Sequence, residues 1–216
     1  VDDGHGSTQA RDVTITVTGT NDAPVITSAA QEDTVKEDET LSVNGQVTAS
    51  DVDHGAVLTY ACTDSSAYGS FAVDLNTGAW TYTLDNDAHQ SLAQGESHVE
   101  EFDVVVTDQW GLSSYQTVTI HVVGTNDDPE AAAATDAGDE DTVISGSVTA
   151  TDIDDGAVLS YALVGAAPAG LTFNPDGSYS LDAADAAYQH LAAGATTEVE
   201  VTYEVTDQHG ASDTAT

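Results

Sequence analysis

The sequence predicts an all-β protein made of tandem antiparallel β-sandwich domains with Greek-key connections. Three observations lead to this prediction. Apolar and β-branched residues alternate with polar ones in short runs such as residues 13–17. Clusters of Gly, Asn, Asp and Pro separate these runs at short intervals. Blocks of sequence also recur after a distance close to the length of one sandwich domain, about 100 residues.

The expected strands follow the alternation. Residues 13–17, 118–122 and 199–205 alternate with period two and are rich in Val, Ile and Thr, so each is predicted to be a strand. Residues 74–78 and 174–177 carry turn residues between strand patterns. Only residues 185–193, with their counterpart 87–93, have a helical character, and we expect one or two helical turns there.

Three blocks repeat along the chain. Residues 17–24 (VTGTNDAP) return as 122–129 (VVGTNDDP), a shift of 105. Residues 48–58 return as 149–159 with a shift of 101, and VTDQWG at 106–111 returns as VTDQHG at 205–210. Such self-similarity is typical of repeat architectures, in which each repeat is one folded unit.

The phase of the repeat predicts the domain organisation. Residues 1–20 are expected to be the terminal strands of a preceding repeat, and residues 21–126 one complete repeat. Residues 127–216 are expected to form a second repeat that stops before its last strand. Because the 216 residues contain no Met, no signal-peptide pattern and no long apolar run, we expect the chain to be part of a longer exported protein without membrane insertion.

The charge balance is strongly acidic. Arg11 and Lys36 are the only basic residues beside 38 Asp and Glu, which gives a formal net charge of −36. A chain with so few cations has nothing to neutralise phosphates, so binding to nucleic acid or to anionic lipid is excluded. A folded chain with this charge must limit its self-repulsion, and divalent cations are one way to do so.

The remaining chemistry is sparse. Cys62 is the single cysteine, so it forms no intramolecular disulfide, and we expect it to be a small buried apolar residue. The sequence has no nucleophile elbow, zinc spacing or phosphate-binding glycine loop, which predicts a protein that is not an enzyme. Trp80 alternates with Tyr82 and is predicted to pack within the sandwich rather than to stack on a sugar.

Carboxylates at recurring positions near strand ends are the candidate metal ligands. Calcium takes six to eight oxygen ligands, and the two carboxylates of a D-x-D motif lie on one face of a strand. Isolated residues such as Asp74, Asp136 and Asp176 are interpreted as turn formers. The second repeat also offers Glu140, Asp182 and Asp185. The predicted Ca²⁺ ligands are Asn21, Asp22, Glu37, Asp51, Asp53, Asp85, Asp87, Asp108, Asn126, Asp127, Asp152, Asp154 and Asp207.

These motifs resemble two known repeat families. Residues 68–85, 92–96, 106–108 and 124–129 together resemble a VCBS repeat, a module of the large RTX adhesins that bacteria export by type I secretion. The resemblance covers nearly the whole chain and is closer in the first repeat. The same positions are similar to cadherin repeats, which implies Ig-like or cadherin-like sandwiches with calcium between successive domains.

The cadherin resemblance implies two ligand groups. At the junction of the two repeats, Glu37, Asp85, Asp87, Asn126 and Asp127 would meet Asp152, Asp154 and Asp207. At the other end of the first repeat, Asn21, Asp22, Asp51, Asp53 and Asp108 would await ligands from a preceding repeat. Gly19, Gly124, Ala23, Asp128 and Asn86 depart from the family motifs, so we expect one or two ions per junction.

The expected function is a calcium-rigidified extender in a bacterial surface adhesin. The partners are adjacent repeats of the same chain, together with weak head-to-tail self-association, because residues 8–17 match the strand that the second repeat lacks. Two alternatives stay open: a β-sandwich that binds a glycan or protein, and a non-catalytic spacer in a secreted enzyme. Aromatic residues make up only 6% of the chain, which gives the glycan alternative little support.

Overall fold

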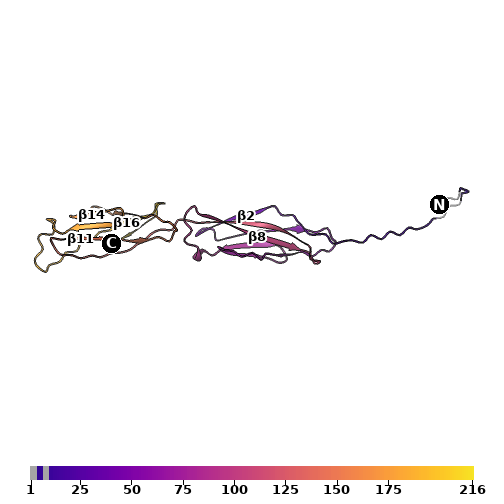
Figure 1. Cartoon of the computed structure of the whole chain (residues 1–216), viewed down its shortest axis with the longest axis horizontal. Helices are drawn as coiled ribbons and strands as arrows, with labels where there is room; N and C mark the ends of the chain where they lie inside the picture. The colour runs from indigo at the N-terminus through magenta and orange to yellow at the C-terminus, as the bar shows by residue number, and fades with distance from the viewer. Residues whose placement is uncertain (1–3, 7–9) are drawn as a thin grey trace.

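The computed structural model describes residues 4–6 and 10–216 and contains two β-sandwich units arranged end to end (Figure 1). Residues 10–24 extend away from the far end of the first unit, and no strand is assigned within them. The described residues contain no helix that is long and apolar enough to cross a membrane. The molecule is therefore elongated, with its two units joined by the short segment around residue 125.

The first unit contains nine strands and one 3₁₀ turn. They are β1 (Val25–Ile26), β2 (Gln31–Lys36), β3 (Ser42–Gln46), β4 (Ala49–Ser50), β5 (Thr59–Ala61), β6 (Gly69–Val73), β7 (Ala79–Leu84), η1 (Asn86–Ala88), β8 (Ser97–Thr107) and β9 (Ser113–Val123). One layer has the strand order β2-β9-β8-β5 and the other β3-β7-β6. The all-β sandwich prediction is thus confirmed.

The second unit repeats the pattern with shorter strands. They are β10 (Glu130–Ala131), β11 (Val143–Ser147), β12 (Ala150–Thr151), β13 (Ser160–Leu163), β14 (Leu171–Phe173), β15 (Ser178–Asp182), β16 (Tyr203–Thr206) and β17 (Ser212–Ala215). Its layers have the orders β13-β16-β17 and β11-β15-β14.

The first unit is organised around the long β8–β9 hairpin. Eleven residue pairs, from Ser97↔Val123 to Thr107↔Ser113, form its antiparallel register. Alternate residues of β8 point inward, so that Phe102, Val104 and Val106 are fully buried, as the period of two predicts. β2 pairs with the second half of β9 in parallel, whereas the other strand pairs of this unit are antiparallel.

Aromatic side chains fill the core between the layers. Phe71 stacks on Phe102 with ring centroids 4.4 Å apart, and on Trp80 with ring centroids 5.7 Å apart. Trp80 is only 3% exposed, which confirms its predicted place in the sandwich. Cys62 is half-buried against the same core, and burial raises the pKa of its thiol.

The carboxylate of Glu100 is buried next to this core and accepts hydrogen bonds from three donors. The Tyr82 hydroxyl donates to Glu100 Oε2 at 2.6 Å, Ser66 Oγ donates to the same oxygen at 2.8 Å, and Ala67 N donates to Oε1 at 2.5 Å. Burial and the Glu100 hydrogen bond raise the pKa of the Tyr82 hydroxyl well above its usual range. In the second unit the repeat places Leu181 and Val199 at the same two positions. Both members of the Tyr82–Glu100 hydrogen-bonded pair are thus replaced by apolar residues in the second unit.

One predicted strand is not formed, and another is formed only in part. Residues 13–17 are extended but are not part of a sheet, and within residues 199–205 the strand begins only at Tyr203. In the first unit the residues equivalent to 199–202 pair with the second half of β9. The described chain has no counterpart of that half-strand, and a lone strand cannot satisfy its backbone groups or bury its apolar face.

The predicted helical turns are also wrong in type. Residues 86–88 form a single 3₁₀ turn, and residues 183–190 form hydrogen-bonded turns without a helix. In the second segment Asp182 Oδ1 accepts a hydrogen bond from Ala184 N at 3.0 Å, and Asp185 Oδ1 accepts one from Ala187 N at 2.9 Å. These side-chain contacts compete with the helical ladder for the same backbone donors.

The Tyr82–Glu100 pair gives a stability prediction. Tyr82→Phe leaves a buried carboxylate oxygen one donor short, so it should lower the free energy of unfolding of the first unit by about 1–3 kcal/mol. Tyr115→Phe is the control, because Tyr115 is 63% exposed. Urea unfolding followed by fluorescence measures both. Equal stability of the two variants would contradict the structural role of the network.

Candidate metal centre

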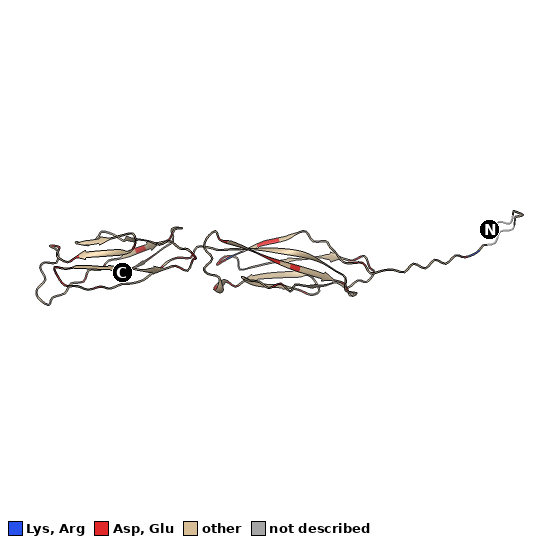
Figure 2. Ribbon diagram, viewed as in Figure 1, with Lys and Arg blue, Asp and Glu red and all other residues tan. Residues whose placement is uncertain are grey.

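Carboxylates from both units converge where the sandwiches meet. Loops at the end of β2 and around η1 supply the first-unit side. The segment after β9, the turn after β12 and the turn between β16 and β17 supply the second-unit side. Acidic positions, red in Figure 2, occur along both units. The backbones touch directly at the junction, where Asp155 N donates to the carbonyl oxygen of Ser91 at 3.0 Å.

The second-unit side is tied together by hydrogen bonds among its own acidic residues. Asn126 Nδ2 donates to Asp207 Oδ2 at 2.6 Å, and Asp127 N donates to Asp154 Oδ2 at 3.0 Å. Asp154 N in turn donates to Asp152 Oδ1 at 3.0 Å, so the D-x-D motif forms a turn after β12 and not a strand with both carboxylates on one face. All five predicted ligands on this side therefore lie in one connected network.

Asp207 holds this network on the end of the β16–β17 hairpin. Its Oδ1 accepts hydrogen bonds from the backbone N–H groups of His209, Gly210 and Ala211 at 2.6–2.9 Å. Gly210 has a φ of +94°, which a side chain would oppose. Despite its burial, the amide of Asn126 and these backbone donors hold the pKa of Asp207 below its usual range.

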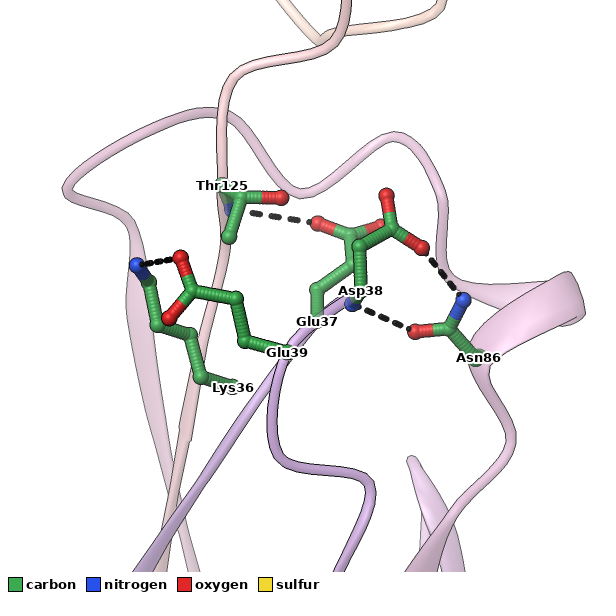
Figure 3. A network of polar contacts seen from close by, with 6 residues as sticks. All are labelled: Lys36, Glu37, Asp38, Glu39, Asn86 and Thr125. Carbon is green, nitrogen blue, oxygen red and sulfur yellow. Dashed lines mark hydrogen bonds and ion pairs between the residues drawn. The ribbon is translucent and has the colours of Figure 1, made fainter.

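The first-unit side centres on Glu37 and Asp38 (Figure 3). Glu37 is fully buried, and its Oε2 accepts a hydrogen bond from Thr125 N at 3.2 Å. Asp38 Oδ1 accepts from Asn86 Nδ2 at 2.6 Å and from Gln90 Nε2 at 3.0 Å. These amides lower the pKa of Asp38. Its φ of +56° is rare for a residue with a side chain and directs it into this contact.

The two sides repel each other electrostatically. Burial, together with the charges of Asp127, Asp38 and Asp154, raises the pKa of Glu37 to about 7. Burial and neighbouring carboxylates also raise the pKa values of Asp127 and Asp154. Raised pKa values of this kind mean that burial and like charges destabilise the ionised forms of these carboxylates.

Several buried oxygens at the junction have no hydrogen-bond partner. They are Asn126 Oδ1, Asp127 Oδ2, Asp152 Oδ2 and Asp154 Oδ1. Buried polar atoms are normally paired, so four such oxygens in one network are free to accept hydrogen bonds or to coordinate a cation. Lys36, the only lysine, does not fill this role, because its Nζ pairs with Glu39 Oε1 at 2.5 Å instead (Figure 3).

The oxygen atoms at the junction are of the kind that Ca²⁺ binds, although they do not surround a common point in this structure. Carboxylate and amide oxygens at 2.3–2.6 Å are the ligands that Ca²⁺ takes. Within residues 4–6 and 10–216, no three His, Cys, Asp or Glu side chains stand close enough to hold a metal ion as they are. A solvent-open depression lined by Asp127, Asp128, Glu130, Thr151, Asp152 and Ile153 gives an ion access. Binding would require the loops to close.

The opposite end of the first unit carries a copy of half this site. Asn21 Nδ2 donates to Asp108 Oδ2 at 2.7 Å, Asp22 N donates to Asp53 Oδ2 at 2.9 Å, and Asp53 N donates to Asp51 Oδ1 at 2.8 Å. Asn21 Oδ1 and Asp51 Oδ2 are buried without a partner. The arrangement matches the second-unit side of the junction bond for bond, so all five ligands predicted for this end are brought together.

Two predicted ligands stand apart from the junction network. Asp85 and Asp87 are exposed, and neither side chain hydrogen-bonds to the network within the described residues. Asn86 between them makes the contact instead. Sequence reasoning missed Asp38, Asn86 and Gln90. The sequence carried a signal for two of them, because Asp38 and Gln90 recur in the second unit as Asp141 and Gln189. There, Gln189 Nε2 donates to Asp141 Oδ1 at 2.8 Å.

Family comparisons agree with this architecture. Residues 21–124 match the model of the bacterial cadherin-like domain, and residues 126–216 match that of the bacterial Ig domain. The first unit is thus similar to bacterial cadherin-like domains and the second to bacterial Ig domains. No functionally curated protein matches it.

Solved structures of similar fold include animal cadherins. Protocadherin gamma B7 extracellular domains 1–4 are 22% identical with a TM-score of 0.55, over 88% of this chain and 47% of that one. Human CDH23 domains EC21–23 are 18% identical with a TM-score of 0.53, over 89% of this chain and 62% of that one. The chain spans less than two thirds of either structure. At this identity the likeness is one of fold.

The raised pKa of Glu37 predicts how the metal-free protein responds to pH. An acid whose pKa is higher in the folded state stabilises the fold below its unfolded pKa, and this stability is lost as the pH rises past the folded value. In a chelator, the free energy of unfolding should therefore fall between pH 4.5 and 7. Glu37 alone would contribute up to about 3 kcal/mol.

Glu37→Gln isolates this contribution, because it removes this one carboxyl group and leaves the other ionisable groups in place. Chemical unfolding of both proteins at several pH values measures the difference. The wild type should lose more stability than the variant on going from pH 5 to pH 8. Parallel pH profiles would show that Glu37 is not held at a raised pKa.

Proposed function

We propose that the chain is a non-catalytic extender module of a bacterial surface adhesin, in which calcium rigidifies the junction between successive sandwiches. The observation that carries the proposal is the set of four buried, unpartnered oxygens in a network that spans the second-unit side of the junction. Glu37 and Asp38 face this network from the first unit. An ion bound among them would be held by residues of both units.

The ligands we propose follow from this arrangement. Asn126, Asp127, Asp152, Asp154 and Asp207 would supply the second-unit side, and Glu37 with Asp38 would supply the first. A bound Ca²⁺ would contribute positive charge that offsets the carboxylate repulsion. Two carboxylates 4 Å apart near a protein surface repel by about 4 kcal/mol, so neutralisation changes the preferred distance between the loops. One or two ions per junction would convert a repulsive hinge into a stiff link.

The extracellular setting is part of the same proposal. Extracellular calcium modules bind at about 10⁻⁴–10⁻³ M, far above cytosolic levels. At ten times the dissociation constant, each ion adds about 1.4 kcal/mol to the folded state. We propose export by type I secretion, display at the cell surface and a role in adhesion or biofilm formation. The elongated end-to-end arrangement supports a role in projecting a distant binding region (Figure 1).

Calcium titration of charge variants tests the proposal. Asp154→Asn keeps the acceptor for Asp127 N but removes one negative charge. In chelator this variant should melt at a higher temperature than the wild type, because repulsion falls. In millimolar calcium it should melt at a lower temperature, because a ligand is lost. Calorimetric titration should show its calcium affinity reduced at least tenfold.

Asp53→Asn is the matched control. Asp53 occupies the same position at the other end of the first unit, where no preceding domain faces it within the described residues. In dilute protein it should leave the junction affinity unchanged. Calcium that neither raises the melting temperature of the wild type nor binds at millimolar concentration would overturn the proposal. The carboxylates would then be solvated turn residues, and the chain a plain acidic spacer.

A further inference from the structure

The linker between the two units stays hydrogen-bonded on both of its edges after β9 ends. Gly124 N donates to the carbonyl oxygen of Glu96 at 3.1 Å, and Thr125 N donates to Glu37 Oε2 at 3.2 Å (Figure 3). β9 lies between β2 and β8 in its sheet, Glu37 follows β2, and Glu96 precedes β8. Successive N–H groups of an extended chain point to opposite edges, so Gly124 is bound along the β8 edge and Thr125 along the β2 edge.

The two edges differ in the groups that they use. On the β8 edge the second unit also contacts the first through main-chain atoms, since Asp155 N donates to the carbonyl oxygen of Ser91 at 3.0 Å. The contact on the β2 edge uses the carboxylate of Glu37, which faces the acidic residues of the second unit. Main-chain hydrogen bonds do not depend on the charge of these carboxylates, so the β8 edge can hold the junction with or without an ion.

Residues 91–96, which make these main-chain contacts, are fixed in the first unit. Leu92 is 6% exposed and belongs to the core between the layers. Glu96 N donates to the carbonyl oxygen of Ala93 at 2.9 Å, which closes the loop with a hydrogen-bonded turn. The loop is therefore held by the fold of the first unit, and the linker rests on it.

Gly124 permits this contact because it has no side chain. A Cβ atom at this position would overlap the carbonyl oxygen of Leu92 and lie 2.6 Å from that of Ala93. Both are backbone atoms, which cannot move aside as a flexible side chain could. The φ of Gly124 lies outside the left-handed region, so the close approach of two backbones, and not a special conformation, requires glycine here.

We propose that residues 91–96, through their contacts with Gly124 and Asp155, form a backbone clamp that holds the second unit without an ion. The junction is then a hinge that is closed along the β8 edge and opens only at its carboxylates. In chelator the second unit swings about the clamp instead of moving freely, which keeps the calcium ligands near their bound positions. Such pre-organisation raises affinity, because less conformational freedom is lost on binding. This effect on affinity rests on the proposed calcium function, whereas the clamp itself does not.

Hydrogen exchange of the wild type in chelator, followed by NMR, tests the clamp without any ion. The amides of Gly124 and Asp155 should exchange at least about tenfold more slowly than those of an unstructured chain, because both are hydrogen-bonded to a fixed loop. Exchange of either amide at the rate of an unstructured chain would overturn the proposal.

Gly124→Ala forces the linker away from the loop and has a matched control. Gly19→Ala makes the same change in the other copy of the VTGTND-like motif, where the added Cβ atom meets none of the described residues within 4 Å beyond its chain neighbours. Small-angle scattering in chelator should show a broader distance distribution for Gly124→Ala than for the wild type, and the same distribution for Gly19→Ala.

Asp155→Pro breaks the clamp from the other side by removing the N–H donor. Asp155 is the second residue of a turn in which Ala157 N donates to the carbonyl oxygen of Asp154 at 3.3 Å and Gly156 has a φ of +77°. This position of the turn favours Pro, so the turn itself is kept. Asp155→Asn is the control, because it removes the same charge and keeps the donor. Distance distributions of Gly124→Ala and Asp155→Pro that both equal those of their controls would contradict the clamp.

Calorimetric titration with calcium separates the clamp from the proposed function. Loss of one hydrogen bond should weaken calcium affinity about fivefold in Gly124→Ala relative to Gly19→Ala, and in Asp155→Pro relative to Asp155→Asn. Equal affinities within both pairs would overturn the pre-organisation. Slow amide exchange in a protein that binds no calcium would support the clamp and count against the calcium function. Calcium binding by a protein whose two amides exchange freely would support the calcium function and count against the clamp.

Discussion

Repulsion among buried carboxylates at the junction is the constraint on which this molecule depends. Glu37 is enclosed between two units and faces Asp127 and Asp154, which raises its pKa to about 7. Desolvated like charges are costly unless a cation or a proton neutralises them. The rest of each sandwich serves to hold these groups at the ends of strands, where closing the junction brings them together. Under the proposed function, the relative position of the two units would depend on whether a cation occupies that site.

The fold achieves this placement by repetition. The turn that closes each final hairpin is organised by one aspartate, Asp108 or Asp207, which gathers three backbone N–H groups and accepts from the preceding asparagine side chain. Each of these aspartates, together with the asparagine that donates to it, forms part of one half of the candidate metal site. The half-site at the far end of the first unit repeats the second-unit side of the junction because the two units share these sequence motifs.

Much of this could be read from the sequence, because alternation and repeats report local constraints. The strand at residues 118–122, the core position of Trp80 and the two groups centred on Asn21 and Asn126 all follow from patterns of a few residues. Asp38 and Gln90 could not be predicted in this way, because their contact joins loops that are 52 residues apart and depends on a left-handed backbone at Asp38. Residues 13–17 and 199–202 have strong strand patterns without a strand, since pairing needs a partner that local sequence does not reveal.

Small-angle scattering of the chain at low protein concentration, in chelator, in magnesium and in calcium, tests the central claim most directly. The account predicts that calcium lengthens and narrows the distance distribution, as expected when a hinge becomes a rigid end-to-end link. Magnesium at the same concentration should do much less, since it retains its water and tolerates fewer geometries. A profile that is the same in chelator, magnesium and calcium would contradict the claim that a cation at the junction sets the shape of the molecule.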